Sequence, residues 1–128
     1  MDLEHLSCLV VEDDEQARKL IVLMLEDMGV RAVCAAGDAD AAKRLLAEAE
    51  EPVHLVICDW MMPGMPGTDL VRELRRTHPD LWVFMVTGRS DASSISEAKG
   101  LGINGFLAKP FRASALEEKI RALLAQMA

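Results

Sequence analysis

The chain has little positive charge and no apolar run long enough to cross a membrane. Its 14 Lys and Arg residues face 21 Asp and Glu residues, which leaves a net charge of −7 at pH 7. This balance argues against nucleic-acid binding, because no basic stripe is present to neutralise phosphates. A bilayer requires about 20 apolar residues, and the acidic start over residues 1–4 is unlike a secretory signal. We therefore expect a cytoplasmic domain that does not insert into membranes.

Cysteine is equally sparse. The three cysteines are far apart, odd in number and embedded in apolar runs, and neither they nor the three histidines have metal-ligand spacing. We interpret the cysteines as small core residues in a reducing compartment. The histidines are interpreted as surface or satisfied polar residues. The residues concerned are Cys8, Cys34, Cys58, His5, His54 and His78.

The residues that are abundant predict the fold. Hydrophobic residues make up 51% of 128 positions, which suits one domain, residues 1–128, with a full core. Five short apolar runs predict buried strands, and stretches of helical periodicity follow each of them. This alternation predicts an α/β fold of five strand–helix units: a doubly wound, flavodoxin-like parallel sheet with helices on both faces. The predicted strands cover residues 8–11, 31–36, 53–58, 81–86 and 105–108.

Local signals mark the expected helix ends. Gly29 follows a helical pattern as a C-terminal cap, and Asp38 precedes one as an N-cap. Ser114 and Glu117 have the spacing of a capping box. Residues 90–102 hold four serines and two glycines with only a thin apolar stripe. We expect a helix of low local stability there.

Polar side chains end four of the five predicted strands: Glu12 and Asp13, Asp59, Thr87, and Lys109. Taken alone, Asp59 could simply cap the turn that follows it. The carboxyl ends of parallel strands share one edge, however, so these side chains should converge. Three carboxylates repel one another unless a hard divalent cation such as Mg²⁺ lies among them. A carboxylate nucleophile, a metal, a cation and a hydroxyl together suit phosphoryl transfer to Asp59.

Four consecutive acids, residues 12–15, separate the first predicted strand from the first predicted helix. Negative charge at a helix N-terminus is favourable, which accounts for Asp14 and Glu15. We therefore place Asp14 just outside the site.

These stretches together resemble the receiver domain of response regulators, the phosphoacceptor module of two-component signalling. Among these, the chain is similar to the chemotaxis-type single-domain regulators. The resemblance extends over roughly the whole chain, with its motifs in the family's order and spacing. It is carried by Val10-Val11-Glu12-Asp13, Asp59 with Met62-Pro63-Gly64, Thr87-Gly88, residues 105–111, and residues 116–120, which look like the subfamily's last helix.

The resemblance implies a role for each strand-end residue. Asp59 is the expected phosphoacceptor. Asp13 is expected to bind Mg²⁺ (or Mn²⁺) directly and Glu12 through water, with Asp59 and the backbone carbonyl of Met61 as further ligands. Lys109 is expected to pair with the phosphoryl group.

The resemblance also implies a switch. Thr87 is expected to reorient onto the phosphoryl group while Phe106 moves inward, although Phe106 could alternatively be a core aromatic. The Lys109–Pro110 peptide bond is expected to be cis. We also expect Trp60 to lie part-exposed at the mouth of the site and to report ligand binding by fluorescence.

Two positions differ from fast-hydrolysing members of the family. Met61 stands two residues after Asp59, and Arg89 two residues after Thr87, where those members tend to carry amide or acidic side chains. Met61 cannot hydrogen-bond an attacking water, and Arg89 could cover the phosphoryl group. We predict slow self-dephosphorylation. The alternative is that Met61 merely shields the site and Arg89 is solvated.

The expected function is signalling rather than metabolic catalysis. A sensor histidine kinase or a histidine phosphotransfer protein is expected to phosphorylate Asp59. Residues 90–102, the fifth strand and the last helix would then present an altered face to an unknown downstream protein. The domain is expected to be a monomer or a phosphorylation-dependent dimer. Alternatively, the chain is the receiver portion of a hybrid histidine kinase or of a longer regulator.

Two further classes of protein are disfavoured. An aspartate-nucleophile phosphatase usually carries a second Asp two residues after the nucleophile, where Met61 stands. A flavodoxin-like nucleotide or flavin carrier would need a Gly-rich phosphate loop after the first strand, and the sequence has none there.

Overall fold

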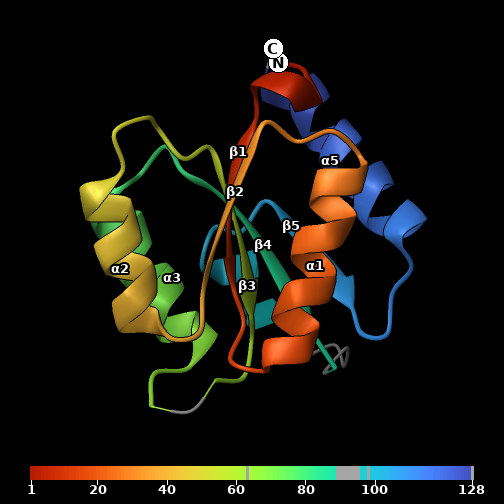
Figure 1. Ribbon diagram of the computed structural model, residues 1–128. Helices are drawn as coiled ribbons and strands as arrows, with labels where there is room; N and C mark the ends of the chain where they lie inside the picture. Colours follow the sequence, from red (N-terminus) through yellow and green to blue (C-terminus); the bar gives the residue numbers. More distant parts are fainter. Residues whose placement is uncertain (63, 89–95, 98, 128) are drawn as a thin grey trace.

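The computed structural model describes residues 1–62, 64–88, 96–97 and 99–127, and it confirms the predicted fold class. Five parallel strands form one sheet in the order β2-β1-β3-β4-β5 (Figure 1). The strands are β1 (Ser7–Val11), β2 (Ala32–Ala36), β3 (Leu55–Asp59), β4 (Trp82–Thr87) and β5 (Gly105–Ala108). The order places β1 and β3 in the middle of the sheet.

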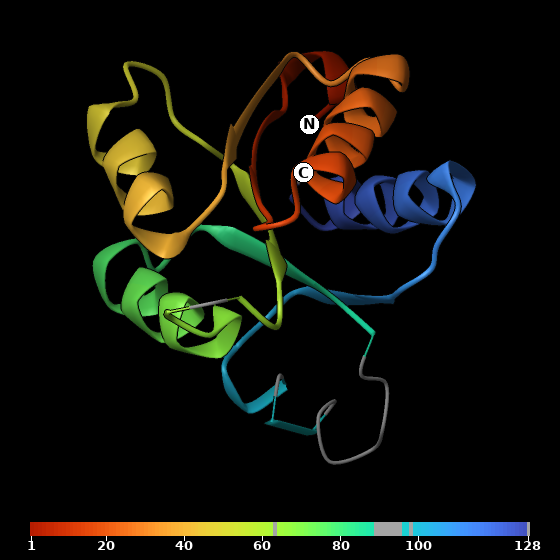
Figure 2. The same cartoon turned by 60° about the horizontal axis from the view of Figure 1, so that its bottom comes forward.

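Helices cover both faces of the sheet. Figures 1 and 2 show α1 and α5 on one face and α2 and α3 on the other. A short 3₁₀ helix, η1 (Leu3–His5), precedes β1. The α-helices are α1 (Glu15–Asp27), α2 (Ala39–Glu48), α3 (Gly67–Thr77) and α5 (Ala113–Met127). The weak helix expected over residues 90–102 lies largely outside the described residues.

Two hydrophobic clusters fill the space between the sheet and its helices. Every residue of β1 and β3 is buried, as expected for parallel strands with helices on both faces. Successive residues alternate between the clusters: Cys8 and Val10 pack toward α1 and α5, whereas Leu9 and Val11 pack toward α2 and α3. Burial of a leucine such as Leu9 contributes about 1.5–3 kcal/mol to the stability of the fold. The core formed in this way holds the strand ends in fixed positions.

The strand bounds differ from the predicted ones by one or two residues, except for β5, which is as predicted. The largest difference is at β3, which begins at Leu55 rather than at residue 53 and continues through Asp59. Asp59 is therefore paired in register with Val86 of β4. The candidate nucleophile belongs to the sheet itself rather than to the loop after it.

Three of the local sequence signals are confirmed. The Asp14 carboxylate accepts a hydrogen bond of 2.8 Å from the Ala17 amide and so caps α1. Asp38 caps α2 in the same way, accepting from the Ala41 amide at 2.7 Å. Gly29 ends α1 with a φ of 94°, a backbone conformation that glycine adopts without strain.

The capping box expected at Ser114 and Glu117 is wrong. Helix α5 begins at Ala113, so Ser114 lies inside the first turn rather than before it. The Glu117 carboxylate instead accepts a 2.9 Å hydrogen bond from Nε of Arg121, one turn further along the helix. The Glu117 side chain therefore pairs with Arg121 within the helix and does not form the capping box.

One other expectation agrees with the structure. The three cysteines are free; Cys8 and Cys58 are buried and Cys34 is half-buried, consistent with small core residues. Within the described part of the chain, no helix is both long and apolar enough to cross a membrane.

Candidate functional site

The polar strand-end residues lie at the carboxyl-end edge of the sheet, which is at the bottom of Figure 1, opposite the two termini. Backbone hydrogen bonds hold Glu12 and Lys109 at this edge. The Glu12 amide donates to the Ala36 carbonyl at 3.0 Å, and the Lys109 amide donates to the Thr87 carbonyl at 2.7 Å. The edge is therefore as rigid as the sheet that supports it.

Three carboxylates gather at this edge. Oxygens of Glu12, Asp13 and Asp59 all lie within 4.8 Å of one another. Glu12 and Asp59 are buried, with exposed fractions of 2% and 7%, whereas Asp13 is exposed. A hard divalent cation that retains several waters prefers this combination of a few carboxylate oxygens and an open side. The residues present therefore fit Mg²⁺ or Mn²⁺.

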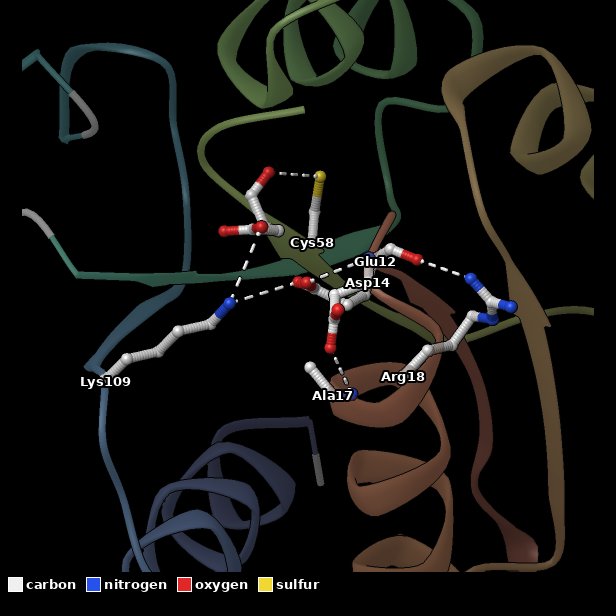
Figure 3. Close-up of polar contacts among 7 residues, drawn as sticks. Glu12, Asp14, Ala17, Arg18, Cys58 and Lys109 are labelled. Carbon is white, nitrogen blue, oxygen red and sulfur yellow. Dashed lines mark hydrogen bonds and ion pairs between the residues drawn. The ribbon is translucent and has the colours of Figure 1, made fainter. Parts of the chain in front are cut away.

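Lys109 closes the cluster from the side of β5. Its Nζ lies 3.2 Å from Oε2 of Glu12 and 3.5 Å from Oδ2 of Asp59. Figure 3 shows the lysine side chain reaching across the sheet edge toward Glu12. Burial alone lowers the pKa of Lys109, but the charges of Asp59 and Glu12 outweigh burial and hold this pKa above its ordinary value. The lysine is therefore a fixed positive charge at the site.

Crowding of the acids is visible in the pKa of Glu12, which is raised from 4.5 to about 7. Burial of the carboxyl group is the main cause, and the contact with the Asp59 carboxylate adds to it. Lys109 offsets these effects only in part. A divalent cation among the three carboxylates would relieve the repulsion that the lysine leaves.

Asp14 takes no part in the cluster. Its carboxylate is used by the α1 cap at the Ala17 amide, as Figure 3 shows. Its own amide lies 3.4 Å from Oε1 of Glu12, at the long end of hydrogen bonding. Two neighbouring acids thus separate into one that faces the site, Asp13, and one that caps a helix.

The remaining predicted residues are placed as follows. Thr87 ends β4 and is buried, with 1% of its surface exposed. Met61 is 57% exposed on the loop after β3. The Lys109–Pro110 peptide bond is cis. Arg89, proposed to slow phosphoryl loss, lies outside the described residues.

The expectation that Trp60 is part-exposed at the mouth of the site is wrong. Only 4% of Trp60 is exposed, because hydrogen bonds at both its amide and its carbonyl fix its backbone. The Trp60 amide donates to the Val86 carbonyl at 3.0 Å, and its carbonyl accepts from the Gly67 amide at 2.9 Å. The indole is thereby directed into the cluster beneath α3. There it meets half-buried Phe106 edge-to-face, with ring centroids 6.4 Å apart and planes at 74°.

Two residues that support the site were missed in the sequence. A Cβ atom at Gly67 would overlap the backbone carbonyl of Asp59, so only glycine allows α3 to begin against the end of β3. Nη1 of Arg18 donates a 2.9 Å hydrogen bond to the Glu12 carbonyl and fixes the turn that carries the acids (Figure 3). In the sequence, Pro66-Gly67 indicates a turn. Nothing in the sequence indicates that Gly67 or Arg18 contacts the strand ends.

Comparison with known proteins gives the same assignment over most of the chain. The profile of the response regulator receiver domain matches residues 8–121. The chain is 37% identical over 114 residues to the chemotaxis protein CheY of Pseudomonas aeruginosa, covering 88% of this chain and 90% of that protein. It is 33% identical over 119 residues to the chemotaxis protein CheY-3 of Vibrio cholerae, with coverage of 91% and 90%.

A solved structure agrees with the sequence comparisons. The response regulator receiver domain protein from Clostridium thermocellum superimposes with a TM-score of 0.85 at 27% identity. The match covers 95% of this chain and 96% of that one.

Proposed function

Because the chain belongs to the response regulator receiver family, the phosphoacceptor modules of two-component signalling, we propose that Asp59 is its phosphoacceptor. One observation carries this assignment. The buried Asp59 carboxylate lies at a strand end between a cluster of two further acids and the ammonium group of Lys109. An ionised carboxylate with a cation beside it is a nucleophile placed where an incoming phosphate would be neutralised.

The proposed reaction transfers a phosphoryl group from the phosphohistidine of a sensor histidine kinase or of a histidine phosphotransfer protein. The phosphorus–nitrogen bond of the donor breaks, and a phosphorus–oxygen bond to Asp59 forms. The donor imidazole leaves with the bonding electron pair and takes up a proton. Mg²⁺ or Mn²⁺, held by Asp13, Asp59, the Met61 carbonyl and, through water, Glu12, would neutralise charge on the transferring group.

The same residues connect the site to the surface. Lys109 exchanges part of its pairing with Glu12 for the phosphoryl oxygens, and Thr87 reorients toward them. Phe106, which contacts Trp60 at the rim of the core, moves with Thr87. The segment over residues 90–102, β5 and α5 would then alter their contacts with a downstream protein.

Slow loss of the phosphoryl group is also proposed. Met61 is 57% exposed beside the acceptor and has no group that could position an attacking water. Substitution of Met61 by Asn supplies such a group and should accelerate decay of the phosphorylated state. An unchanged decay rate would show that Met61 does not set it.

Intact-mass measurement tests the central assignment. The protein is incubated with acetyl phosphate, with and without Mg²⁺, beside D59N and the control D69N. Asp69 is an exposed residue of α3 that pairs with Arg72 at 3.0 Å. We expect a Mg²⁺-dependent gain of one phosphoryl group in the wild type and in D69N, and none in D59N. An equal gain in D59N would contradict the assignment.

A further inference from the structure

The outward face of α1 carries two leucines that the fold leaves exposed. Among the described residues, four large hydrophobic side chains are exposed, and Leu20 and Leu23, at 54% and 55%, are neighbours one turn apart on α1. A single exposed leucine is ordinary, but an adjacent pair forms a patch. The inward face of α1 is already used, since Ile21 and Leu25 are buried against the sheet.

The two leucines belong to a longer pattern on the same face. Gln16, Leu20, Leu23 and Asp27 follow one another at spacings of four, three and four residues, the spacing of a helix–helix seam. Lys19 and Glu26 flank this seam on one side. All six residues are exposed, and together they are called the α1 stripe below.

The charges of the α1 stripe are arranged to complement a second copy of themselves. Its amino-terminal half carries Lys19, and its carboxyl-terminal half carries Glu26 and Asp27. If two α1 helices pack antiparallel about a two-fold axis between the leucines, Leu20 of each copy lies against Leu23 of the other. Lys19 of each copy then lies beside Glu26 of the other, because flanking positions of this kind meet in antiparallel pairs.

The same arrangement places the Gln16 amide opposite the Asp27 carboxylate of the second copy, a hydrogen-bonding pair. A parallel arrangement would instead bring equal residues of the seam level, with Asp27 near Asp27. We propose that α1 mediates symmetric, antiparallel self-association of this protein through the α1 stripe. The two-fold axis repeats the leucine contact, the ion pair and the amide–carboxylate pair twice each.

The association should be weak. Two part-exposed leucines on each chain bury far less than the roughly 1,200 Å² of a stable interface. Lys19 already contacts Glu15 of its own helix at 3.0 Å, so part of the new ion pair replaces an existing one. The two chains also repel each other through a net charge of −7 each. Dimers should therefore form only toward the upper micromolar range.

Complementary charge substitutions test the proposal without depending on one variant. In K19E the two flanking pairs become Glu–Glu, and in E26K they become Lys–Lys, so each variant alone should associate about tenfold more weakly. In a mixture of K19E and E26K, both flanking pairs of the mixed dimer are Glu–Lys again. Sedimentation equilibrium of the unphosphorylated protein at physiological salt should show recovery of wild-type association in the mixture.

Matched substitutions on α2 provide the control. Arg44 and Glu48 are exposed and four residues apart, so R44E and E48K repeat the same charge changes away from the α1 stripe. Neither variant, nor their mixture, should differ from the wild type beyond the effect of net charge. L23S should weaken self-association at least as much as K19E does.

Two results would overturn the proposal. One is a wild-type protein that stays monomeric up to near-millimolar concentration, which would assign the leucine pair to a different protein, such as the phosphoryl donor. The other is a mixture of K19E and E26K that associates no better than either variant alone.

Discussion

Polar groups have different partners at the two edges of the sheet, one at the amino ends of the strands and the other at their carboxyl ends. At the amino-end edge, polar groups are satisfied locally: the Ser7 amide donates to Nδ1 of His54 at 3.0 Å, and Nδ1 of His78 lies 2.9 Å from the Thr77 hydroxyl. This edge borders an open cavity of about 770 Å³ lined mostly by apolar side chains and by both histidines. At the carboxyl-end edge, three carboxylates share one space with a single lysine close by.

The difference favours the carboxyl-end edge as the ligand site. The open cavity lies at the amino-end edge, but both histidines that line it already have partners within the chain. The acidic site buries Glu12 beside Asp59, and burial together with the contact between the two carboxylates raises the pKa of Glu12 to about 7. An unfavourable crowding of buried carboxylates is expected at a site where binding of a ligand relieves it.

Substitution of Gly67 by Ala should have the largest effect. The added Cβ overlaps the Asp59 carbonyl, so α3 must move away from the end of β3. We expect the free energy of unfolding to fall by roughly 2–3 kcal/mol and phosphorylation to slow with it. Chemical denaturation measures the first effect. The control G100A adds a Cβ where nothing lies within 4 Å; equal losses in both variants would refute the proposed contact.

Substitution of Glu12 by Gln should stabilise the metal-free protein at pH 8. The folded-state pKa of Glu12, about 7, lies above the ordinary 4.5. The favourable contribution of the protonated group is therefore complete below pH 4.5 and is lost as the pH rises through 7. E12Q removes that loss, so its gain should grow from near zero at pH 4.5 to roughly 2–3 kcal/mol at pH 8.

The control for E12Q is E15Q, whose effect should have the opposite sign. Lys19 lowers the pKa of Glu15, so the ionised form is favoured in the folded protein and E15Q should destabilise it slightly at neutral pH. Denaturation in the presence of a chelator at both pH values measures the two variants. A gain for E12Q that does not depend on pH would contradict the assigned repulsion.

Mg²⁺ should stabilise the folded protein through Asp13 but not through Asp14. At ten times its dissociation constant, a ligand specific to the folded state adds about 1.4 kcal/mol. D13N should lose this increment. D14N should retain it, because Asp14 caps α1 and Asn is an equally good cap. Thermal melts with and without Mg²⁺ decide the point, and loss of the increment in both variants would place Asp14 in the site.

Fluorescence of Trp60 should change only modestly on phosphorylation. Trp60 is buried and senses the site through its edge contact with Phe106 rather than through solvent. The measurement requires the W82F background, since Trp82 is half-buried and also emits. In F106L the change should shrink further. A change of the same size in F106L would show that Phe106 does not transmit the signal.

The fold and the outline of the site could be predicted from the sequence because they depend on short-range patterns. Alternating strands and helices determine the parallel sheet, and a parallel sheet brings Glu12, Asp59 and Lys109 to one edge. The division between Asp13 and Asp14 followed from the need of α1 for an N-terminal cap.

What could not be predicted depends on the direction of individual side chains in three dimensions. The burial of Trp60 follows from its backbone hydrogen bonds to Val86 of β4 and to Gly67 at the start of α3. The need for glycine at 67 arises from the approach of α3 to β3, which the sequence does not record. The capping box at Ser114 failed because the ion pair between Glu117 and Arg121 competes with it.

The most direct test of the account is to locate the phosphoryl group. Borohydride reduces an aspartyl phosphate to homoserine, and peptide mass spectrometry then identifies the modified residue. After reaction with a phosphohistidine donor in the presence of Mg²⁺, we predict homoserine at position 59 alone. Homoserine at position 13, or a protein left unmodified while the donor loses its phosphoryl group to water, would contradict the assignment of Asp59 as the acceptor.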